Sequence, residues 1–148
     1  DALWCSSYSG QTCQGMAESV LGMYNPSGRL PFTVPVDADQ LGSIEDYSMV
    51  SGNGRTYRYL NVTAAPPLFS FGYGLSYTEW RVDGMDLSAS SIRLMPPGTP
   101  TPLNVTTTIT NVGTHAGAYV VQAYIAFGDE DLLPKRQLLG FDSAQSVF

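Results

Sequence analysis

The sequence has few charged side chains and no long apolar run. Charged residues make up 14% of its 148 residues, while hydrophobic residues make up 43%. That balance is too apolar for a disordered chain, so we expect a folded protein. A membrane-spanning helix needs about 18 or more consecutive apolar residues, and none occur, so no membrane span is expected. Residues 1–5 lack the basic segment and apolar stretch of a signal peptide, so we do not interpret them as one.

Basic side chains are also scarce, since 7 Lys and Arg stand against 13 Asp and Glu, for a net charge of −6. The basic residues form no cluster, so a polyanion such as nucleic acid is not an expected partner. A lightly charged, acidic surface rich in Tyr, Thr, Ser and Asn suits an extracellular protein that meets neutral ligands such as sugars. The composition therefore favours an extracellular location and a carbohydrate partner.

Histidine and cysteine are too few for a metal centre built on nitrogen and sulfur ligands. His115 is the single histidine and lies far in sequence from Cys5 and Cys13, so we expect no metal and no cofactor. The two cysteines are either free buried thiols or a disulfide, and for a secreted chain we predict the disulfide. Residues 129–131 are three adjacent acids, which could hold calcium but in such a loop are more often solvated.

Two positions fit the N-x-S/T acceptor pattern for N-linked glycans. Asn61 and Asn104 each begin an NVT sequence, whereas the proline after Asn25 blocks the pattern there. Asn104 also falls on the polar face of a predicted strand, where a glycan has room. We therefore predict N-glycosylation at Asn61 and Asn104.

Residues 1–35 have the pattern of the end of an α/β unit. Residues 2–5 form a short apolar run that predicts a buried strand. Apolar side chains at helical spacing predict a helix over residues 12–24. The sequence NPSG at residues 25–28 is expected to end that helix, because proline cannot continue it and glycine favours a turn. An extended segment follows over residues 29–35.

Residues 36–78 show no strong periodicity but are rich in aromatic side chains. A connection this long is normally disordered or functional. Its aromatic content argues against disorder, so we interpret it as an ordered irregular arm packed between two domains. The arm contains the aromatic and basic sequence RTYRY at residues 55–59 and an aromatic-rich stretch at residues 69–77.

Residues 79–148 change to the period-two pattern of β-strands. We predict a first strand over residues 80–87 with an irregularity at Gly84, and further strands over 103–110, over 118–127 and from 138 onward. On the third strand the apolar side chains share one face. The spacing predicts an antiparallel β-sandwich.

The predicted sandwich is incomplete. A sandwich of this type has about seven strands in about 100 residues, whereas the pattern here gives four. The strand at residues 2–5 likewise has no predicted sheet neighbours. We therefore expect this chain not to fold alone, and to pack on the remainder of a parent polypeptide or on other chains.

The ordered set of motifs resembles glycoside hydrolase family 3. The sequence WCSSYSGQTCQGMAESVLGMYNPSGRLPFTVP is similar to the end of that family's α/β sandwich domain. GRTYRYL and PLFSFGYGLSYT resemble the arm that follows. TITNVGTHAGAYVVQAYIAF and KRQLLGF resemble the start of the family's fibronectin type III-like domain. The resemblance implies three regions: residues 1–35, the arm 36–78, and an incomplete antiparallel sandwich over 79–148.

The resemblance also implies a retaining mechanism with two carboxyl groups, a nucleophile and an acid/base. In the family the nucleophilic Asp lies on a preceding barrel and the acid/base Glu lies earlier in the α/β domain. Neither motif is present, so we assign no catalytic residue to this chain. The implied function is a scaffold fragment of a secreted β-glycosidase that acts on terminal β-linked glucose or xylose. The alternative is a non-catalytic extracellular glycoprotein module derived from the same family.

The arm carries the strongest candidate for a substrate rim, the set Arg55, Tyr57, Arg58 and Tyr59. Guanidinium and phenol groups can hydrogen-bond to a sugar and stack on it. The competing interpretation, which we favour, is that the set fastens the arm to neighbouring domains. Glu18 and the acidic pair at residues 45–46 are better explained as solvated. His115 lies in a predicted turn of the other domain, so a Ser-His-Asp triad is not expected.

Overall fold

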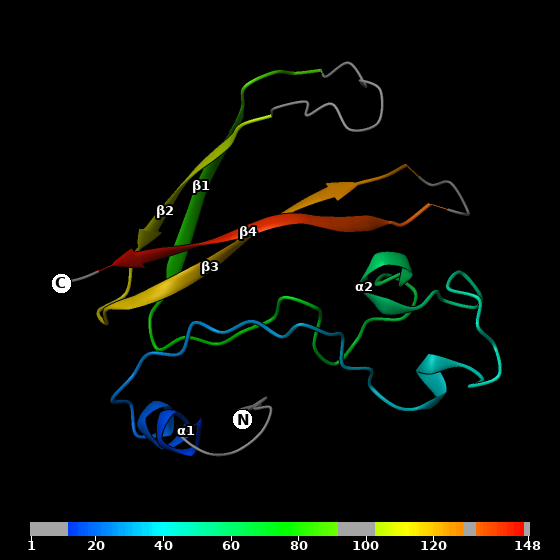
Figure 1. Ribbon diagram of the computed structural model, residues 1–148, viewed down its shortest axis with the longest axis horizontal. Coiled ribbons are helices and arrows are strands. Elements are labelled where there is room, and N and C mark those ends of the chain that lie inside the picture. The colour runs from blue at the N-terminus through cyan, green and yellow to red at the C-terminus, as the bar shows by residue number, and fades with distance from the viewer. Residues whose placement is uncertain (1–11, 92–102, 129–132, 147–148) are drawn as a thin grey trace.

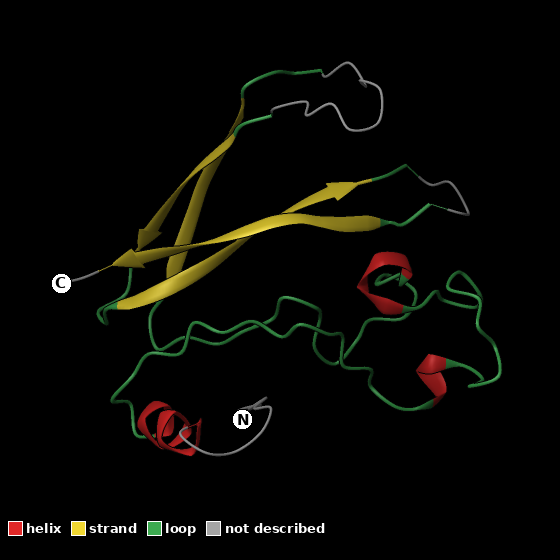
Figure 2. Ribbon diagram, viewed as in Figure 1, coloured by secondary structure: helices red, strands yellow, loops and turns green. Residues whose placement is uncertain are grey.

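The structure, a computed structural model, describes residues 12–91, 103–128 and 133–146. Within these residues it consists mostly of antiparallel strands in two small sheets, with few helices (Figures 1 and 2). The predicted strand at residues 2–5, with Cys5, and the acidic triplet at residues 129–131 lie outside the described residues. The helical elements are α1 (Thr12–Val20), the 3-10 turn η1 (Asp39–Leu41) and α2 (Thr56–Tyr59).

Helix α1 is shorter than the sequence predicted, because it ends at Val20 and not at Tyr24. The reason is Gly22, whose φ of 74° is a left-handed conformation that glycine adopts without strain. The N–H of Met23 then donates to the carbonyl of Glu18 at 2.8 Å, which is the bond of a Schellman motif. The helix therefore stops at this glycine, before the proline that was expected to end it.

The apolar stripe of α1 is left uncovered by the described residues. Val20 at the end of α1, and Leu21 and Met23 just after it, are 70%, 73% and 75% exposed, while Met16 is half-buried. Ser19, in contrast, is buried, and its carbonyl accepts a 2.6 Å hydrogen bond from the Tyr77 hydroxyl. The contact fastens the helix to the end of the arm through a polar group and leaves its apolar side chains open.

The extended segment after α1 pairs with the end of the arm, as two neighbouring antiparallel traces (Figure 1). The N–H of Leu30 donates to the carbonyl of Tyr73 at 2.8 Å. Val34 and Phe69 exchange backbone hydrogen bonds of 2.8 and 3.2 Å. The arm therefore leaves this segment, forms a loop that holds η1 and α2, and returns alongside it.

The first sheet pairs β1 (Trp80–Leu87) with β2 (Val105–Asn111), antiparallel, with Trp80 opposite Asn111. Its register shifts between Asp83 and Asp86, where Gly84 has a φ of 63°. The irregularity predicted at this glycine is therefore confirmed, because an extra residue in one strand is accommodated by a left-handed backbone. Both strands lie within two residues of their predicted bounds.

The second sheet pairs β3 (Gly117–Ala126) with β4 (Arg136–Ser146), also antiparallel. The exposure of β3 does not alternate, since its residues are half-buried from Gly117 to Tyr124. Gly72 of the arm approaches Gln122 and Tyr124 so closely that a side chain at position 72 would collide with them. The arm thus covers the face opposite the one that the apolar pattern marked as core.

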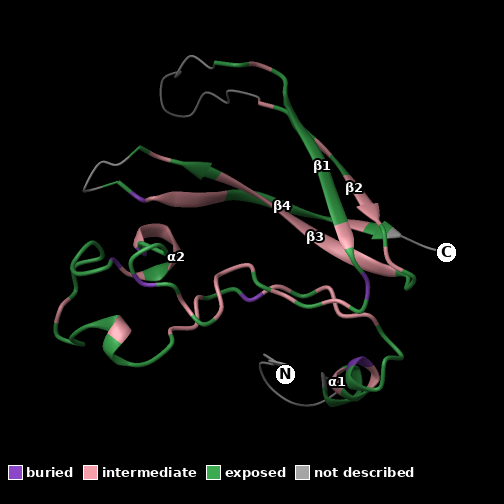
Figure 3. Ribbon diagram, turned by 180° about the vertical axis from the view of Figure 1, so that it is seen from behind, coloured by how far each residue is buried: buried purple, intermediate pink, exposed green. Residues whose placement is uncertain are grey.

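Among the described residues, the buried apolar side chains lie on the arm and its partner segment, apart from Pro134 just before β4 (Figure 3). Leu30, Leu60 and Ala65 are each 8% exposed. On the sheets, Phe141 and Met85 remain 73% and 67% exposed. The arm is therefore the best packed part of the described residues.

Candidate functional site

The loop before α2 is shaped by Gly54, which is buried and has a φ of 78°. Its N–H donates to the carbonyl of Ser51 at 3.0 Å, and the N–H of Arg55 donates to the carbonyl of Met49 at 2.8 Å. A Cβ at this position would meet the backbone carbonyl of Tyr59. Only glycine therefore lets the chain turn here against the end of α2.

Thr56, the first residue of α2, has the only positive φ among the described non-glycine residues, at 55°. A β-branched residue rarely adopts this conformation, and such strain tends to lie at functional or structurally constrained positions. Its hydroxyl accepts a 3.3 Å hydrogen bond from the N–H of Arg58, which partly offsets the strain. The backbone turn at Thr56 sets the directions in which the next three side chains point.

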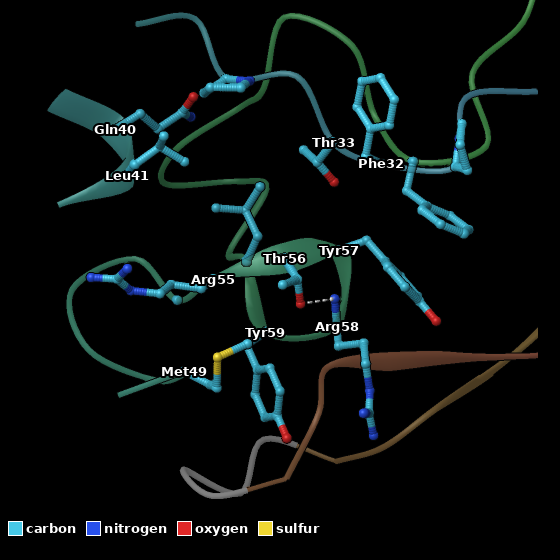
Figure 4. A pocket seen from close by; sticks show the side chains of 15 residues that line it. Phe32, Thr33, Gln40, Leu41, Met49, Arg55, Thr56, Tyr57, Arg58 and Tyr59 are labelled. Carbon is cyan, nitrogen blue, oxygen red and sulfur yellow. Dashed lines mark hydrogen bonds between the residues drawn. The ribbon is translucent and has the colours of Figure 1, made fainter. Parts of the chain in front are cut away.

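The four predicted rim residues line one cavity of about 600 Å³ between α2 and the extended segment (Figure 4). The cavity lining also includes Phe32, Thr33, Gln40, Leu41, Met49 and Phe71. The structure therefore brings together Arg55, Tyr57, Arg58 and Tyr59 as a single cluster. Whether they touch substrate stays a prediction.

The polar groups of Tyr57 bind strand β4. Its hydroxyl accepts a hydrogen bond from the N–H of Leu138, and its carbonyl accepts one from Nε of Arg136, both at 3.3 Å. The ring of Tyr57 stacks on Phe71 with 4.1 Å between centroids and meets Tyr124 edge-on at 6.2 Å. Tyr57 thus bridges the arm, β3 and β4.

Arg58 also binds the second sheet. Its Nη2 donates to Gln137 Oε1 at 3.0 Å, and its carbonyl accepts a 2.6 Å hydrogen bond from the N–H of Lys135. Its guanidinium lies 5.7 Å from the ring centroid of Tyr59. In Figure 4 its side chain extends from α2 toward the strands, away from Thr33.

On β3, the ring of Tyr124 meets Tyr57 edge-on. Burial raises the pKa of the Tyr124 phenol, and the positive charge of Arg136 partly opposes this rise.

Arg55 binds the arm itself. Its Nη2 donates to the carbonyl of Ser43 at 2.7 Å and lies 3.9 Å from Oδ2 of Asp46. The hydroxyl of Ser51 and then the N–H of Ser48 hold the pKa of the Asp46 carboxyl below its ordinary value, with a smaller contribution from Arg55. Arg55 therefore closes the loop that flanks the cavity.

The lowered pKa of Asp46 leads to a prediction about pH. A folded-state pKa below the unfolded value means that the carboxylate contacts stabilise the loop above the unfolded pKa, and that this contribution is lost as pH falls through the folded pKa. We expect Ser51→Ala to raise the pKa of Asp46, because it removes the largest cause of the shift. NMR titration of carbon-13-labelled aspartate would measure this. Ser43→Ala is the matched control, since its hydroxyl binds the N–H of Glu45; an unchanged Asp46 pKa in Ser51→Ala would contradict the assignment.

Groups suited to metal or triad chemistry do not assemble in the described parts of the chain. No three His, Cys, Asp or Glu side chains gather there at metal-binding distance. His115 lies in the turn between β2 and β3, with its Nδ1 3.2 Å from the Thr114 hydroxyl, and does not line the cavity. Among the described helices none is long and apolar enough to cross a membrane.

Both predicted glycan acceptors are exposed. The Asn61 side-chain oxygen accepts hydrogen bonds from the N–H groups of Thr63 and Ala64 at 3.2 Å, and Asn104 lies just before β2. Glycosylation at both stays a prediction. Cys13 is exposed and its predicted partner Cys5 lies outside the described residues, so the disulfide also stays a prediction.

Asn25 is a structural residue that the sequence analysis missed. Its Nδ2 donates to the carbonyl of Ala116 at 2.9 Å, and its Oδ1 accepts from the Ser76 hydroxyl and the Tyr77 N–H, both at 2.9 Å. One side chain thus joins the end of α1, the end of the arm and the β2–β3 turn. Periodicity could not reveal this, because the three partners lie 51 to 91 residues away.

Comparisons with known proteins agree on one family. Residues 1–77 match the profile described as the glycosyl hydrolase family 3 C-terminal domain. The chain is 36% identical to a xylan 1,4-beta-xylosidase from Xylanibacter ruminicola, over 96% of this chain and 15% of that protein. It is 34% identical to a probable beta-glucosidase I from Aspergillus flavus, over 90% of this chain and 17% of that protein. The crystal structure of a beta-glucosidase from Chaetomella raphigera matches with a TM-score of 0.71 and 33% identity, over 90% of this chain and 20% of that chain.

Proposed function

The chain belongs to glycoside hydrolase family 3, and from this membership we propose that it is the scaffold portion of a secreted retaining β-glycosidase that hydrolyses terminal β-linked glucose or xylose. Support comes from relatives named as a xylan 1,4-beta-xylosidase and a probable beta-glucosidase, each matched over at least 90% of this chain. The chain spans 15–17% of the length of these two relatives. We call the polypeptide that would contain it the full-length protein.

The finer fold assignment is part of the same proposal. Residues 1–35 are the end of an α/β sandwich domain, and residues 79–148 begin a fibronectin type III-like sandwich, with the arm 36–78 between them. The two antiparallel pairs β1–β2 and β3–β4 support this, since each leaves apolar side chains open for further strands. The sheet neighbours of residues 1–35 would come from the full-length protein.

The observation that carries the scaffold role is the direction of the polar groups in the cluster. Arg55 binds Ser43 and Asp46, while Tyr57 and Arg58 bind Lys135, just before β4, and residues 136–138 at its start. These contacts hold the three side chains to protein groups, so a sugar that took up the same donors and acceptors would have to displace internal hydrogen bonds. The cluster therefore fastens the arm to the second sheet, and the catalytic carboxyl groups are supplied from outside this chain.

We expect the isolated chain to show no turnover of aryl β-glucoside or aryl β-xyloside, and the full-length protein to hydrolyse at least one of them. The reason is that both carboxyl groups of a retaining mechanism are required and neither family motif is here. A colorimetric assay of both purified proteins measures this. Turnover by residues 1–148 that is abolished by a substitution within them would refute the scaffold role. A folded full-length protein without turnover would favour the non-catalytic module.

A further inference from the structure

The cavity beside α2 is lined mainly by apolar groups, and several of the polar groups around it are already bonded. The Gln40 amide accepts from the Val36 N–H and donates to the carbonyls of Ala65 and Pro66. The Thr56 hydroxyl accepts from Arg58. The hydroxyl of Thr33 and Nε of Arg58 differ, since both atoms are buried and have no hydrogen-bond partner among the described residues.

Figure 4 shows Thr33 on the extended segment, facing Thr56 on α2 across the cavity. The Thr33 hydroxyl and Nε of Arg58 are therefore polar atoms beside the cavity that no protein group pairs. A buried polar atom without a partner carries a cost in free energy. We call the cavity, with its lining residues 31–33, 35, 40–41, 49, 54–60 and 71, the apolar socket.

Next to the apolar socket lies an exposed apolar edge. Ile44 and Tyr47 are 89% and 90% exposed, and Leu41 and Met49, which line the socket, are also exposed. Exposed apolar groups that gather beside a cavity are typical of interaction sites. The edge therefore adds exposed apolar side chains in the segment that carries Leu41 and Met49 of the socket.

The same edge carries acidic groups only. Residues 36–50 contain four Asp and Glu side chains and no Lys or Arg: Asp37, Asp39, Glu45 and Asp46. Arg55, which follows, is drawn to Asp46 and Ser43. A partner surface with Lys or Arg beside an apolar side chain would complement this edge, whereas a second copy would bring acid against acid.

We propose that the apolar socket receives an apolar side chain, flanked by Lys or Arg, from a segment of the same polypeptide that lies outside residues 1–148. This inference rests on the proposed function, in which the chain is one part of a longer glycosidase. The length of the relatives supports it, since at least 83% of each of the two described above lies outside the region matched by this chain. A tyrosine or tryptophan fits best, because its large ring fills a space of this size.

A sugar is a poorer occupant of the apolar socket. A sugar ring presents hydroxyl groups around its edge, and each needs a partner when it leaves water. Several groups around the socket are bonded to the arm or to β4, and among the residues described the Thr33 hydroxyl, Nε of Arg58 and the Tyr59 hydroxyl are the unpaired ones, too few for all the hydroxyl groups of a sugar ring. An apolar side chain needs no such partners.

Site-specific photo-crosslinking in the full-length protein tests the proposal. Leu41 is replaced by benzoylphenylalanine, and crosslinked peptides are identified by mass spectrometry. We expect one dominant crosslink, to a peptide outside residues 1–148 of the same polypeptide, with an apolar residue next to Lys or Arg. The matched control is benzoylphenylalanine at Val62, an exposed apolar arm residue within a glycan acceptor sequence, where we expect a severalfold lower yield.

Three outcomes would overturn the proposed occupant of the socket. These are crosslinks confined to residues 1–148, crosslinks to a second copy, or a crosslinking yield at Leu41 that falls when glucose or xylose is added. The last would assign the cavity to substrate. Glycosidase activity of the unsubstituted full-length protein is assayed in parallel. Crosslinking without activity would reject the enzyme but keep the socket, and activity without the crosslink would reject the socket alone.

Discussion

Replacing Gly54 by alanine is expected to open the arm, with a loss of local stability of about 2–5 kcal/mol. An alanine at this φ of 78° is strained by about 1–2 kcal/mol. Its Cβ would also lie 2.7 Å from the carbonyl carbon of Tyr59 and closer still to the oxygen. Neither backbone can yield without moving α2, and such overpacking adds about 1–3 kcal/mol. Tyr57 and Arg58, which hold the arm to β4, come soon after Gly54 in the sequence. Their contacts with β4 are therefore expected to weaken too.

Hydrogen exchange in the full-length protein measures this effect, through amide protection of residues 54–65. A loss of 2 kcal/mol or more lowers protection at least roughly 30-fold. Gly52→Ala is the matched control, because Gly52 has a φ of 60° but nothing within 4 Å of a new Cβ. Gly52→Ala should lose about 1–2 kcal/mol of local stability, from the backbone strain alone and without a collision. Equal amide protection in the two variants would show that the collision with Tyr59 does not determine the stability of the loop.

Replacing Asn25 by alanine is expected to loosen the joint between α1, the arm and the β2–β3 turn. Three hydrogen bonds of 2.9 Å are lost at once. At about 0.5–1.5 kcal/mol each, the local cost is about 2–4 kcal/mol. The amide of Tyr77 loses its acceptor directly, so its exchange should accelerate most. Hydrogen exchange of residues 76–78 and 112–118 in the full-length protein checks the result.

Two further variants distinguish the loss of the Asn25 hydrogen bonds from a general effect of removing an asparagine side chain. Asn25→Asp keeps an acceptor for Tyr77 but sets a carboxylate against the Ala116 carbonyl, so residues 112–118 should lose protection while Tyr77 keeps it. Asn53→Ala removes an exposed asparagine side chain and should change stability by no more than about 0.5 kcal/mol. If Asn25→Ala behaves like Asn53→Ala, the side chain does not hold the joint.

Strand positions followed closely from the sequence, because they depend on local pattern. Alternating β-branched and aromatic side chains located four strands, and a glycine located the bulge in β1. Helix α1 was predicted four residues too long, since apolar spacing continued past Gly22 while the backbone did not. The pattern also marked one face of β3 as core, whereas the arm packs on the other, at Gln122 and Tyr124.

The motif order by itself determined the family and grouped Arg55, Tyr57, Arg58 and Tyr59, because such motifs are contiguous in sequence. Tertiary structure alone decided what these side chains do. Arg58 and Tyr57 find their partners 79 and 81 residues away on β4, and Asn25 finds one 91 residues away. No local rule specifies contacts at that separation, since they depend on how the arm folds back onto the sheets. The turn at Gly54 and Thr56 sets that path, and so directs the hydroxyl of Tyr57 and Nη2 of Arg58 toward β4.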